Sequence, residues 1–462
     1  MKFFKEFRGQ QVRLLMRTFT QAFKFDVFDI HHEFSAGRVK LNSLSSNTLP
    51  RPGHLIRFGS FLFQTLKALR ESGDNEGEEN VPRNGVLFFV VTKNQHDALA
   101  PVCRLTRKGY LAGEGVQVQV NFPHRRTAFI LALPLLPLLI FRLWRSKNYK
   151  VITNYYLDRF WFTYGYYVTA CLWLAKLQPS AVVLANDHSY PNRTILEAAR
   201  NQDIPTFYLQ HAAVAEIFPI LAFDYALLDG ICALRTYDKI GVSPTIVFLI
   251  GMPKADAFYN SHNTEMAVRT LGIATNRHDP VERVEELCSR IRMNLPRIQM
   301  VLRPHPREEE HRVLKWRQIA ETYEIEMSDP QKEISFGFLA RCDAIIAGHS
   351  SILLEAAVIN VVPLYYDFIL MKLDDYGFLE MGLSEYFCDP NEICSRLEQL
   401  MKAKPSVRIK AKPYVHTIGT IFDGHSSELA ASLIAAVVDG NSDFMRNWRR
   451  IPNVNLKSYE LV

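Results

Sequence analysis

The sequence lacks the patterns that define several common enzyme classes. Its seven cysteines are scattered and form no Cys-x-x-Cys pair, which argues against a disulfide framework or a cysteine zinc site and predicts reduced thiols. No P-loop GxxxxGK[ST], GxGxxG, HExxH or GxSxG stands in a fitting context. This argues against P-loop nucleotide hydrolases, dinucleotide oxidoreductases, zincins and α/β-hydrolases. No Asp-x-Asp follows a predicted strand, so a metal-bridged substrate is not indicated.

The sequence also lacks an apolar run long enough to span a membrane. The most apolar stretch, 128–141, has 14 residues and contains Pro134 and Pro137, whereas a spanning helix needs about 20. Basic residues flank it on both sides. The stretch predicts either a segment that enters one leaflet and binds anionic headgroups or a buried, kinked helix, and both interpretations stay open. We expect no spanning helix and no secretory signal.

Charge is distributed unevenly along the chain. Residues 1–150 contain 23 Lys and Arg against 11 Asp and Glu, whereas the rest contain 31 against 37. A basic first third predicts an anionic partner, such as membrane lipid, nucleic acid or an acidic polymer. No nucleic-acid-binding module is recognisable. We therefore expect no nucleic acid, a cytoplasmic location and a peripheral contact with the inner face of the cell membrane.

Strand and helix patterns alternate along most of the chain. Apolar β-rich runs such as 86–91 and 299–302 alternate with helical patterns such as 352–358, and 116–120 (VQVQV) has the alternation of a strand. Short apolar strands separated by helices predict parallel sheets covered on both faces. Two such series follow one another. The fold class is therefore α/β, with two doubly wound, Rossmann-like domains facing a cleft.

The boundaries of these domains follow from the same patterns. Residues 1–84 are predicted to be an N-terminal extension that ends in an acidic, disordered loop over 71–84. The first domain covers 85–262 and the second covers 263–440. Residues 441–462 are predicted to be a C-terminal tail.

Polar residues at two strand ends of the second domain predict a phosphate site. Arg303 and His305 follow one strand, and Ser350 and Ser351 stand between another strand and a helix. Arg and His donate hydrogen bonds to phosphate oxygens, and the free N–H groups at a helix start attract anions. Glu355, about one turn into the helix, could accept from ribose hydroxyls. Plain helix capping and a solvated loop are the alternative interpretations.

Three strand ends of the first domain carry candidate catalytic bases. They are His211, Asp187 and Asp229, any of which could deprotonate an acceptor hydroxyl if it faces the cleft. Asp187 could instead orient a histidine, and His211 could be a structural residue. Lys254, in the turn that closes the first domain, could reach the donor phosphates or be a solvated linker residue.

The residues of the second domain resemble a known superfamily. LRPHP (302–306) and RCDAIIAGHSSILLEAAVINVVPLYY (341–366) resemble the C-terminal half of GT-B transferases that build bacterial surface polymers. The similarity is to CDP-glycerol glycerophosphotransferases of teichoic-acid and capsule synthesis and to polysialyltransferases. It implies that His305, Ser350 and Ser351 hold the phosphates of the donor nucleotide.

Two further similarities concern single residues. The same segment is similar to nucleotide-sugar 2-epimerases, which implies a ribose-binding role for Glu355. Glycerophosphotransferases carry a Trp-His-Gly motif with a catalytic histidine, and the matching place here reads Gln210-His211-Ala212. Polysialyltransferases carry an acidic pair before Gly, of which Asp229 before Gly230 retains one acid.

The resemblance implies a GT-B glycosyltransferase or glycerophosphotransferase. It would use a CMP-, CDP- or UDP-linked donor as substrate, with no metal or other cofactor required, and a bacterial surface glycan or lipid-linked acceptor. One alternative is a nucleotide-sugar 2-epimerase or hydrolase on the same fold. Another is a non-catalytic GT-B-like scaffold of a polysaccharide export complex.

Overall fold

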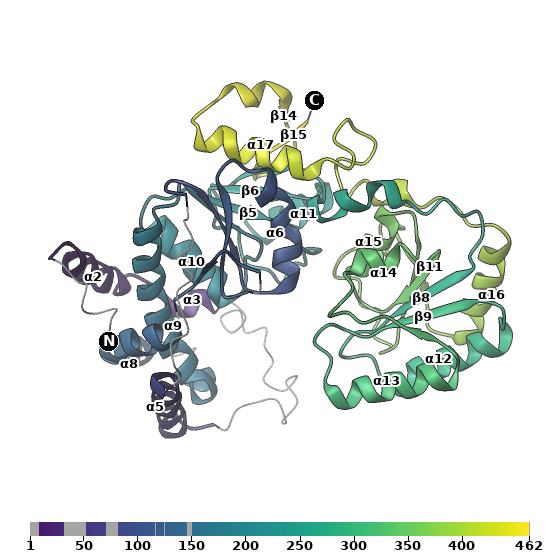
Figure 1. Ribbon diagram of the computed structural model, residues 1–462, viewed down its shortest axis with the longest axis horizontal. Coiled ribbons are helices and arrows are strands. Elements are labelled where there is room, and N and C mark those ends of the chain that lie inside the picture. The colour runs from purple at the N-terminus through teal and green to yellow at the C-terminus, as the bar shows by residue number, and fades with distance from the viewer. Residues whose placement is uncertain are drawn as a thin grey trace.

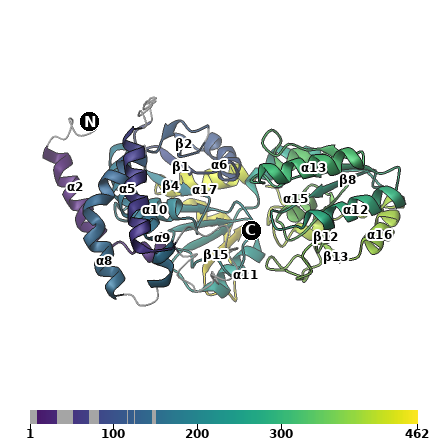
Figure 2. The ribbon, with the colours of Figure 1, turned by 90° about the horizontal axis from the view of Figure 1, so that it is seen from below.

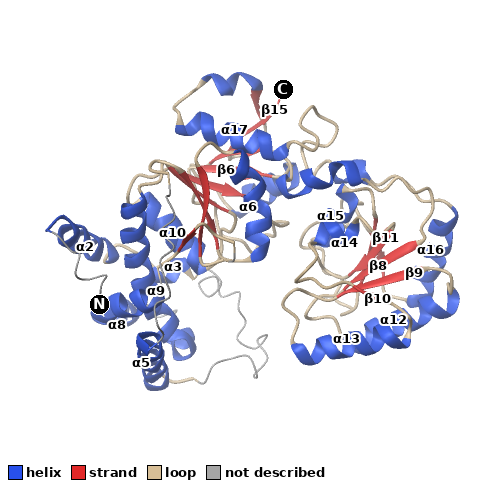
Figure 3. Cartoon of the chain, in the orientation of Figure 1, coloured by secondary structure: helices blue, strands red, loops and turns tan. Residues whose placement is uncertain are grey.

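The structure, a computed structural model, contains two α/β domains (Figure 1). Each domain is built on one sheet with helices on both faces (Figure 3). The doubly wound α/β architecture predicted from the sequence is therefore confirmed. The described residues are 9–31, 52–70, 82–115, 117–123, 125–145 and 150–461.

The first sheet has nine strands in the order β14-β15-β7-β6-β5-β4-β1-β2-β3. Its neighbours pair in parallel except β14 and β15, which are antiparallel. Strands such as β1 are continuous buried apolar runs, because helices cover both faces of the sheet. The strands are β1 (Val86–Val90), β2 (Gly109–Gly113), β3 (Val120–Asn121), β4 (Ala181–Leu184), β5 (Thr206–Leu209), β6 (Tyr225–Leu228), β7 (Ile246–Leu249), β14 (Trp448–Arg450) and β15 (Lys457–Leu461).

Helices cover the two faces of this sheet with separate cores. Leu99 and Leu433 belong to the core on one face, and Tyr167 and Ile195 to the core on the other. The helices are α2 (Gly9–Ala22), α3 (Val27–Ile30), α5 (His54–Arg70), α6 (Lys93–Leu105), α7 (Arg125–Ala132), α8 (Leu136–Arg145), α9 (Lys150–Leu177), α10 (Tyr190–Arg200), α11 (Ile231–Ile240) and α17 (Ser426–Val438), with the 3-10 segments η2 (Leu133–Leu135), η4 (Pro253–Ser261) and η6 (Asp443–Asn447).

The second sheet has six parallel strands in the order β10-β9-β8-β11-β12-β13. The registers of β8, β9, β11 and β12 bring their carboxyl ends to one edge of the sheet. The elements are β8 (Thr270–Ala274), β9 (Gln299–Arg303), β10 (Glu326–Met327), β11 (Ala344–Ala347), β12 (Val362–Tyr366), β13 (Glu385–Phe387), α12 (Val281–Asn294), α13 (Glu310–Thr322), α14 (Ser335–Leu339), α15 (Ile352–Val358), α16 (Pro390–Lys402) and η5 (Arg408–Ala411).

The C-terminal end of the chain returns to the first domain. The sequence predicts a tail over 441–462, whereas β15 lies beside β7, with Lys457 opposite Ile246, and β14 extends the sheet further. Helix α17, which falls in the range predicted for the second domain, packs on α6 of the first. The predicted boundaries differ from the structure because β15 is short and partly polar, and because its partner β7 is far away in the sequence.

The N-terminal range also differs from the prediction. Helices α2 and α5, within the predicted extension, pack on α9 and share its core. Of the acidic loop over 71–84, residues 71–81 lie outside the described residues. The strand predicted over 116–120 is wrong, because among its described residues only Val120 belongs to a strand, and β2 forms earlier in the sequence.

The apolar stretch 128–141 lies inside a longer helical segment. Arg125–Arg145, 21 residues interrupted by the 3-10 turn η2, is the one described helix long and apolar enough to cross a membrane by length and composition. The helical segment is therefore longer than the 14-residue apolar run, and the expectation that it does not span a membrane stays a prediction. Of its most apolar 18-residue window, 39% is buried. Trp161 Nε1 of α9 donates a 2.7 Å hydrogen bond to the Ala132 carbonyl oxygen, which ties this segment to the domain core.

Gly165 on α9 permits the close contact with α7. A Cβ atom at this position would lie 1.8 Å from the Ala128 carbonyl oxygen. We expect Gly165→Ala to lower the free energy of unfolding by about 3 kcal/mol, because the two helices must separate to admit a methyl group. Gly59→Ala on α5 is the matched control, since nothing lies within 4 Å of its Cβ position, and should be neutral or stabilising. Equal unfolding curves for the two variants would contradict this packing.

Candidate functional site

Three neighbouring strands of the first sheet end in polar residues. β4 leads into Asp187 and His188, β5 into Gln210 and His211, and β6 into Asp229. Ligands of open α/β sheets bind at the carboxyl ends of such strands. Asp187 and His188 each contribute to the electrostatic environment of His211, and Glu355 of the second domain contributes to that of Asp229. The predicted residues of the first domain therefore lie close together.

Both oxygens of the Asp187 carboxylate have partners, so the group is not a free base. Its Oδ1 lies 2.9 Å from His188 Nδ1, and its Oδ2 accepts a 2.5 Å hydrogen bond from the Tyr237 hydroxyl. The Asp187 side chain is buried, whereas the His188 side chain is 37% exposed and packs on Phe218. A carboxylate that binds one ring nitrogen fixes the orientation and tautomer of an imidazole. Of the two interpretations given above, the contacts therefore favour the orienting one.

His188 is a candidate that the sequence reasoning missed. It stands in the motif Asn186-Asp187-His188, shortly after the buried strand β4. The signal that could have found it is the Asp-His doublet, because adjacent side chains in a tight turn can form an acid–histidine pair. Asn186 Nδ2 lies 3.3 Å from His188 Nε2, so both ring nitrogens of His188 have a polar neighbour.

His211 has one ring nitrogen with a partner and one without. The ring hydrogen-bonds to the backbone of Ala185, whereas its Nδ1 is buried and has no hydrogen-bond partner among the described residues. Burial, then the Lys254 cation and His188, lower the pKa of His211 to about 4. The imidazole is therefore neutral at physiological pH, and it can accept a proton at Nδ1.

Asp229 is a buried carboxyl with an unused oxygen. The residue is 2% exposed, and its Oδ1 has no hydrogen-bond partner within the described part of the chain. Burial raises the pKa of Asp229 well above its usual range, Lys254 opposes that rise, and Glu355 adds to it. Its backbone N–H donates a 2.9 Å hydrogen bond to Gln210 Oε1. Such a carboxyl is suited to donate or accept a hydrogen bond with a bound polar group.

Lys254 links the two domains. Its Nζ donates to Glu355 Oε1 at 2.5 Å and to the His211 carbonyl oxygen at 3.1 Å. The Lys254 side chain is 16% exposed and the Glu355 side chain is 9% exposed. The solvated-linker interpretation of Lys254 is therefore wrong. A cavity of only about 20 Å³ lies at this junction, between Gln210 of the first domain and Leu354 of the second.

The strand ends of the second domain present His305, Ser350 and Ser351 together at one edge. All three are partly exposed. His305 Nδ1 accepts a 3.1 Å hydrogen bond from the Arg307 N–H, so a neutral ring carries its proton on Nε2. Burial, then the Arg307 cation, lower the pKa of His305, which favours that neutral form. The Ser351 hydroxyl makes no capping hydrogen bond to α15, which leaves it available to a ligand.

Arg303 does not belong to this group. It is 6% exposed, and its guanidinium donates to Ser328 Oγ at 2.7 Å and to the Glu333 carbonyl oxygen at 2.8 Å. It also lies over the Phe338 ring at 5.4 Å. These contacts hold the Arg303 guanidinium within its own domain. The predicted phosphate role of Arg303 is therefore corrected to a structural one. No group of three or more His, Cys, Asp or Glu placed to hold a metal occurs among the described residues.

Comparisons with known proteins give the fold. No protein-family model matches the sequence, and no curated protein matches it either. Among solved structures, the chain is similar to one reported as a UDP-N-acetylglucosamine 2-epimerase from Listeria monocytogenes, with a TM-score of 0.53 and 13% identity over 78% of this chain and 98% of that one. It is also similar to S. aureus MnaA in complex with UDP, with a TM-score of 0.50 and 13% identity over 77% and 97%.

A further similar structure is that of the wall teichoic acid polymerase TagF. It has a TM-score of 0.49 and 12% identity, covering 84% of this chain and 97% of that one, a likeness too distant to carry an argument. The first two likenesses cover nearly the whole of those chains and show that this protein has the GT-B fold. At these identities they show the fold alone.

Proposed function

We propose that the protein is a GT-B transferase. It moves a sugar or polyol phosphate from a CMP-, CDP- or UDP-linked donor onto a bacterial surface glycan or its lipid-linked precursor. The observation that carries the proposal is the convergence at the domain junction of residues from both sheets. His211 and Asp229 hold buried polar atoms without partners among the described residues, and Lys254 joins the His211 backbone to Glu355. A bound polar substrate would supply hydrogen-bond partners for these unsatisfied buried polar atoms at the strand ends.

The mechanism that we propose is direct displacement. His211 Nδ1 takes the proton of the acceptor hydroxyl as its oxygen forms the new bond to the transferred group. The bond to the leaving nucleoside phosphate breaks, and the Nε2 proton of His305 with the hydroxyls of Ser350 and Ser351 stabilises the developing charge. In the same proposal, Asp229 and Glu355 bind substrate hydroxyls. No step uses a metal ion.

The acceptor side of the proposal includes a location. A transferase that extends a surface polymer from a cytoplasmic nucleotide donor works where lipid-linked acceptors are made. We propose a peripheral position at the inner face of the cell membrane, supported by the basic first third of the chain.

The test has a binding step and a turnover step. A thermal-shift screen against CMP, CDP, UDP, GDP and their sugars identifies the nucleotide, and transfer from the matching donor is then measured with and without acceptor glycans. Acceptor-dependent turnover supports the proposal. Turnover without acceptor would identify a 2-epimerase or hydrolase, and binding without turnover would identify a scaffold.

His305→Ala is the variant that tests the donor site. We expect kcat to fall by about 10²–10³, because one donor to the leaving phosphate is lost. His311→Ala is the matched control, since His311 is an exposed histidine near the start of α13 in the same domain. Full activity of His305→Ala, with an unchanged melting temperature, would remove His305 from the site.

A further inference from the structure

Three helices of the first domain carry apolar side chains on both of their faces. One face packs inward, as Phe61 of α5 and Leu139 of α8 do. The other is exposed to solvent, and its large side chains include Met16 on α2, Leu55, Phe63 and Leu66 on α5, and Phe141 and Trp144 on α8. A surface helix of a water-soluble protein normally has a polar outer face. An apolar outer face shared by three helices marks an interaction surface.

These helices gather at one end of the molecule. In both ribbon views α2, α5 and α8 lie at the end of the first domain that is farthest from the second sheet (Figures 1 and 2). We call the outer faces of these three helices the apolar end. It is remote from the junction where Lys254 meets Glu355, so the proposed active site does not explain it.

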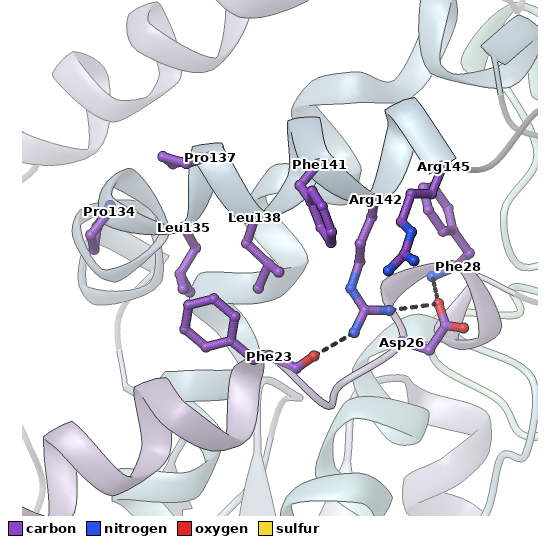
Figure 4. A pocket seen from close by; sticks show the side chains of 10 residues that line it. All are labelled: Phe23, Asp26, Phe28, Pro134, Leu135, Pro137, Leu138, Phe141, Arg142 and Arg145. Atoms are coloured by element: carbon purple, nitrogen blue, oxygen red, sulfur yellow. Dashed lines mark hydrogen bonds and ion pairs between the residues drawn. The ribbon is translucent and has the colours of Figure 1, made fainter.

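A groove runs along the apolar end between the segment after α2 and helix α8 (Figure 4). Its volume is about 840 Å³, and Phe23, Leu135, Leu138 and Phe141 line its apolar part. Arg142 crosses it to donate to the Phe23 carbonyl oxygen at 2.7 Å. The groove is therefore apolar along its length and basic at one end.

The charges around the apolar end are mostly positive. Arg142 and Arg145 end α8, and Lys67 and Arg70 end α5. The acidic residue at the groove, Asp26, faces Arg142 at 3.6 Å, so one cation there is partly compensated. Arginine and lysine at the rim of an apolar face bind anionic headgroups while the apolar side chains enter the acyl boundary. This complementarity selects an anionic lipid bilayer as the occupant.

The packing of α7 sets how deep the segment can enter the bilayer. Ala128 and Ala132 of α7 are fully buried against α9, and Gly165 of α9 is closely covered by α7. A spanning arrangement of Arg125–Arg145 would require this contact to separate and expose the core. An arrangement in which α8 lies in the plane of the interface keeps it intact.

We propose that the apolar end inserts into one leaflet of an anionic bilayer, with α8 in the plane of the interface and not across it. The inference rests on the peripheral location proposed above and deepens it, by naming the surface and its depth. It places the junction of the two domains away from the lipid, facing the cytoplasm.

The experiment uses the full chain and vesicles of phosphatidylethanolamine with phosphatidylglycerol. Trp144 is 78% exposed, while Trp161, Trp173, Trp316 and Trp448 are at most 9% exposed, so a change in tryptophan emission reports on Trp144. We expect a blue shift with these vesicles and a weaker one with phosphatidylcholine alone. Phe63→Glu combined with Trp144→Glu should lower vesicle affinity, measured by sedimentation, by more than about tenfold.

Two single variants complete the set. Arg145→Gln should lower affinity by about fivefold, the factor equal to about 1 kcal/mol for one basic residue at an anionic surface. Met293→Glu is the matched control, because Met293 is 70% exposed on α12 of the second domain, and it should bind like the wild type.

Depth is measured with lipids brominated at different positions. In a Trp144→Phe background, Leu133→Trp puts the probe near the middle of Arg125–Arg145. In-plane insertion predicts that shallow bromines quench both Trp144 of the wild type and the tryptophan at position 133 of this variant. Quenching at position 133 by deep bromines would show a spanning helix and overturn the proposal.

The remaining outcomes separate the surface from the location. Failure of the wild type to bind any vesicle would overturn the membrane location and this surface together. Binding that survives the double substitution would overturn the surface alone. Dimerisation without lipid, lost in the double variant, would show that a second copy covers the apolar end instead. Transfer activity is assayed separately, so none of these results bears on catalysis.

Discussion

His211→Gln is expected to lower kcat/KM for transfer by about 10²–10⁴, the usual contribution of a general base. Glutamine can keep a hydrogen bond to the backbone of Ala185, but it has no counterpart of the unpartnered Nδ1 that would accept the acceptor proton. Because this change leaves the second domain untouched, the nucleotide dissociation constant should stay the same. Steady-state transfer and calorimetric nucleotide titration check the two parts of this result.

The pH dependence gives the same prediction a second readout. The pKa of His211 is lowered to about 4 by burial, so the base loses its lone pair only below that pH, and the acid limb of kcat/KM should lie near pH 4. Stability follows with a definite sign. Between the ordinary value of 6.5 and about 4, the unfolded chain binds the proton and the folded chain does not, so wild-type stability falls as pH falls. That loss should be smaller in His211→Gln.

His188→Gln is the control for the identity of the base. If His211 is the base, His188→Gln should lower kcat/KM much less than His211→Gln does. The His188 ring contacts Asp187 and Asn186 and takes no proton in the proposed mechanism. A larger loss in His188→Gln, together with an acid limb that changes only in that variant, would assign the base to the Asp187–His188 pair. His211 would then be structural.

Lys254→Met is expected to lower the free energy of unfolding by about 3–5 kcal/mol, because it leaves a buried carboxylate without its cation. Glu355 is 7% exposed and makes its ion pair with Lys254. The double variant Lys254→Met with Glu355→Gln should recover most of the loss, since neither charge remains. Urea unfolding of the full chain measures the free energy of unfolding of the wild type, the two single variants and the double variant, which form a double-mutant cycle.

The matched control for this cycle is an exposed ion pair. Lys239 and Glu216 lie 3.3 Å apart with side chains 71% and 67% exposed, so Lys239→Met should cost less than about 1 kcal/mol. If Lys254→Met costs no more than that, the link between the domains contributes little to stability. Nucleotide affinity of Lys254→Met then shows whether Glu355, once released from the ion pair, binds a substrate hydroxyl as proposed above.

Most of the fold was predictable because buried strands and capped helices leave local patterns. The helix over 352–358 was predicted at the bounds it has, from the apolar pattern that follows Ser350 and Ser351. The strand predicted over 116–120 is wrong, because VQVQV has the alternation of a strand but residues 117–119 lie outside the sheet. Strand β15 was missed because its pairing with β7 depends on residues far apart in sequence.

The positions of the candidate residues at strand ends were predictable, whereas their contacts were not. Strand ends located His211, Asp229, His305 and the serine pair, because parallel strands present their carboxyl ends at one edge. Roles depend on partners that the sequence does not reveal. Arg303 has the chemistry of a phosphate ligand, but Ser328 and Glu333 occupy its guanidinium. Asp187 has the chemistry of a base, but Tyr237 and His188 occupy its carboxylate.

The pairing of β15 with β7 has a consequence for synthesis. The nascent chain emerges N-terminus first, and β7 is made long before Lys457–Leu461 leaves the ribosome. Until then the first sheet has an open edge at β7, which other chains could join. The second domain, whose strands are continuous in sequence from Thr270 to Phe387, can complete its sheet earlier. We therefore expect the first domain to finish folding after the second, and truncation after η6 to leave the edge of β7 permanently exposed and prone to aggregation.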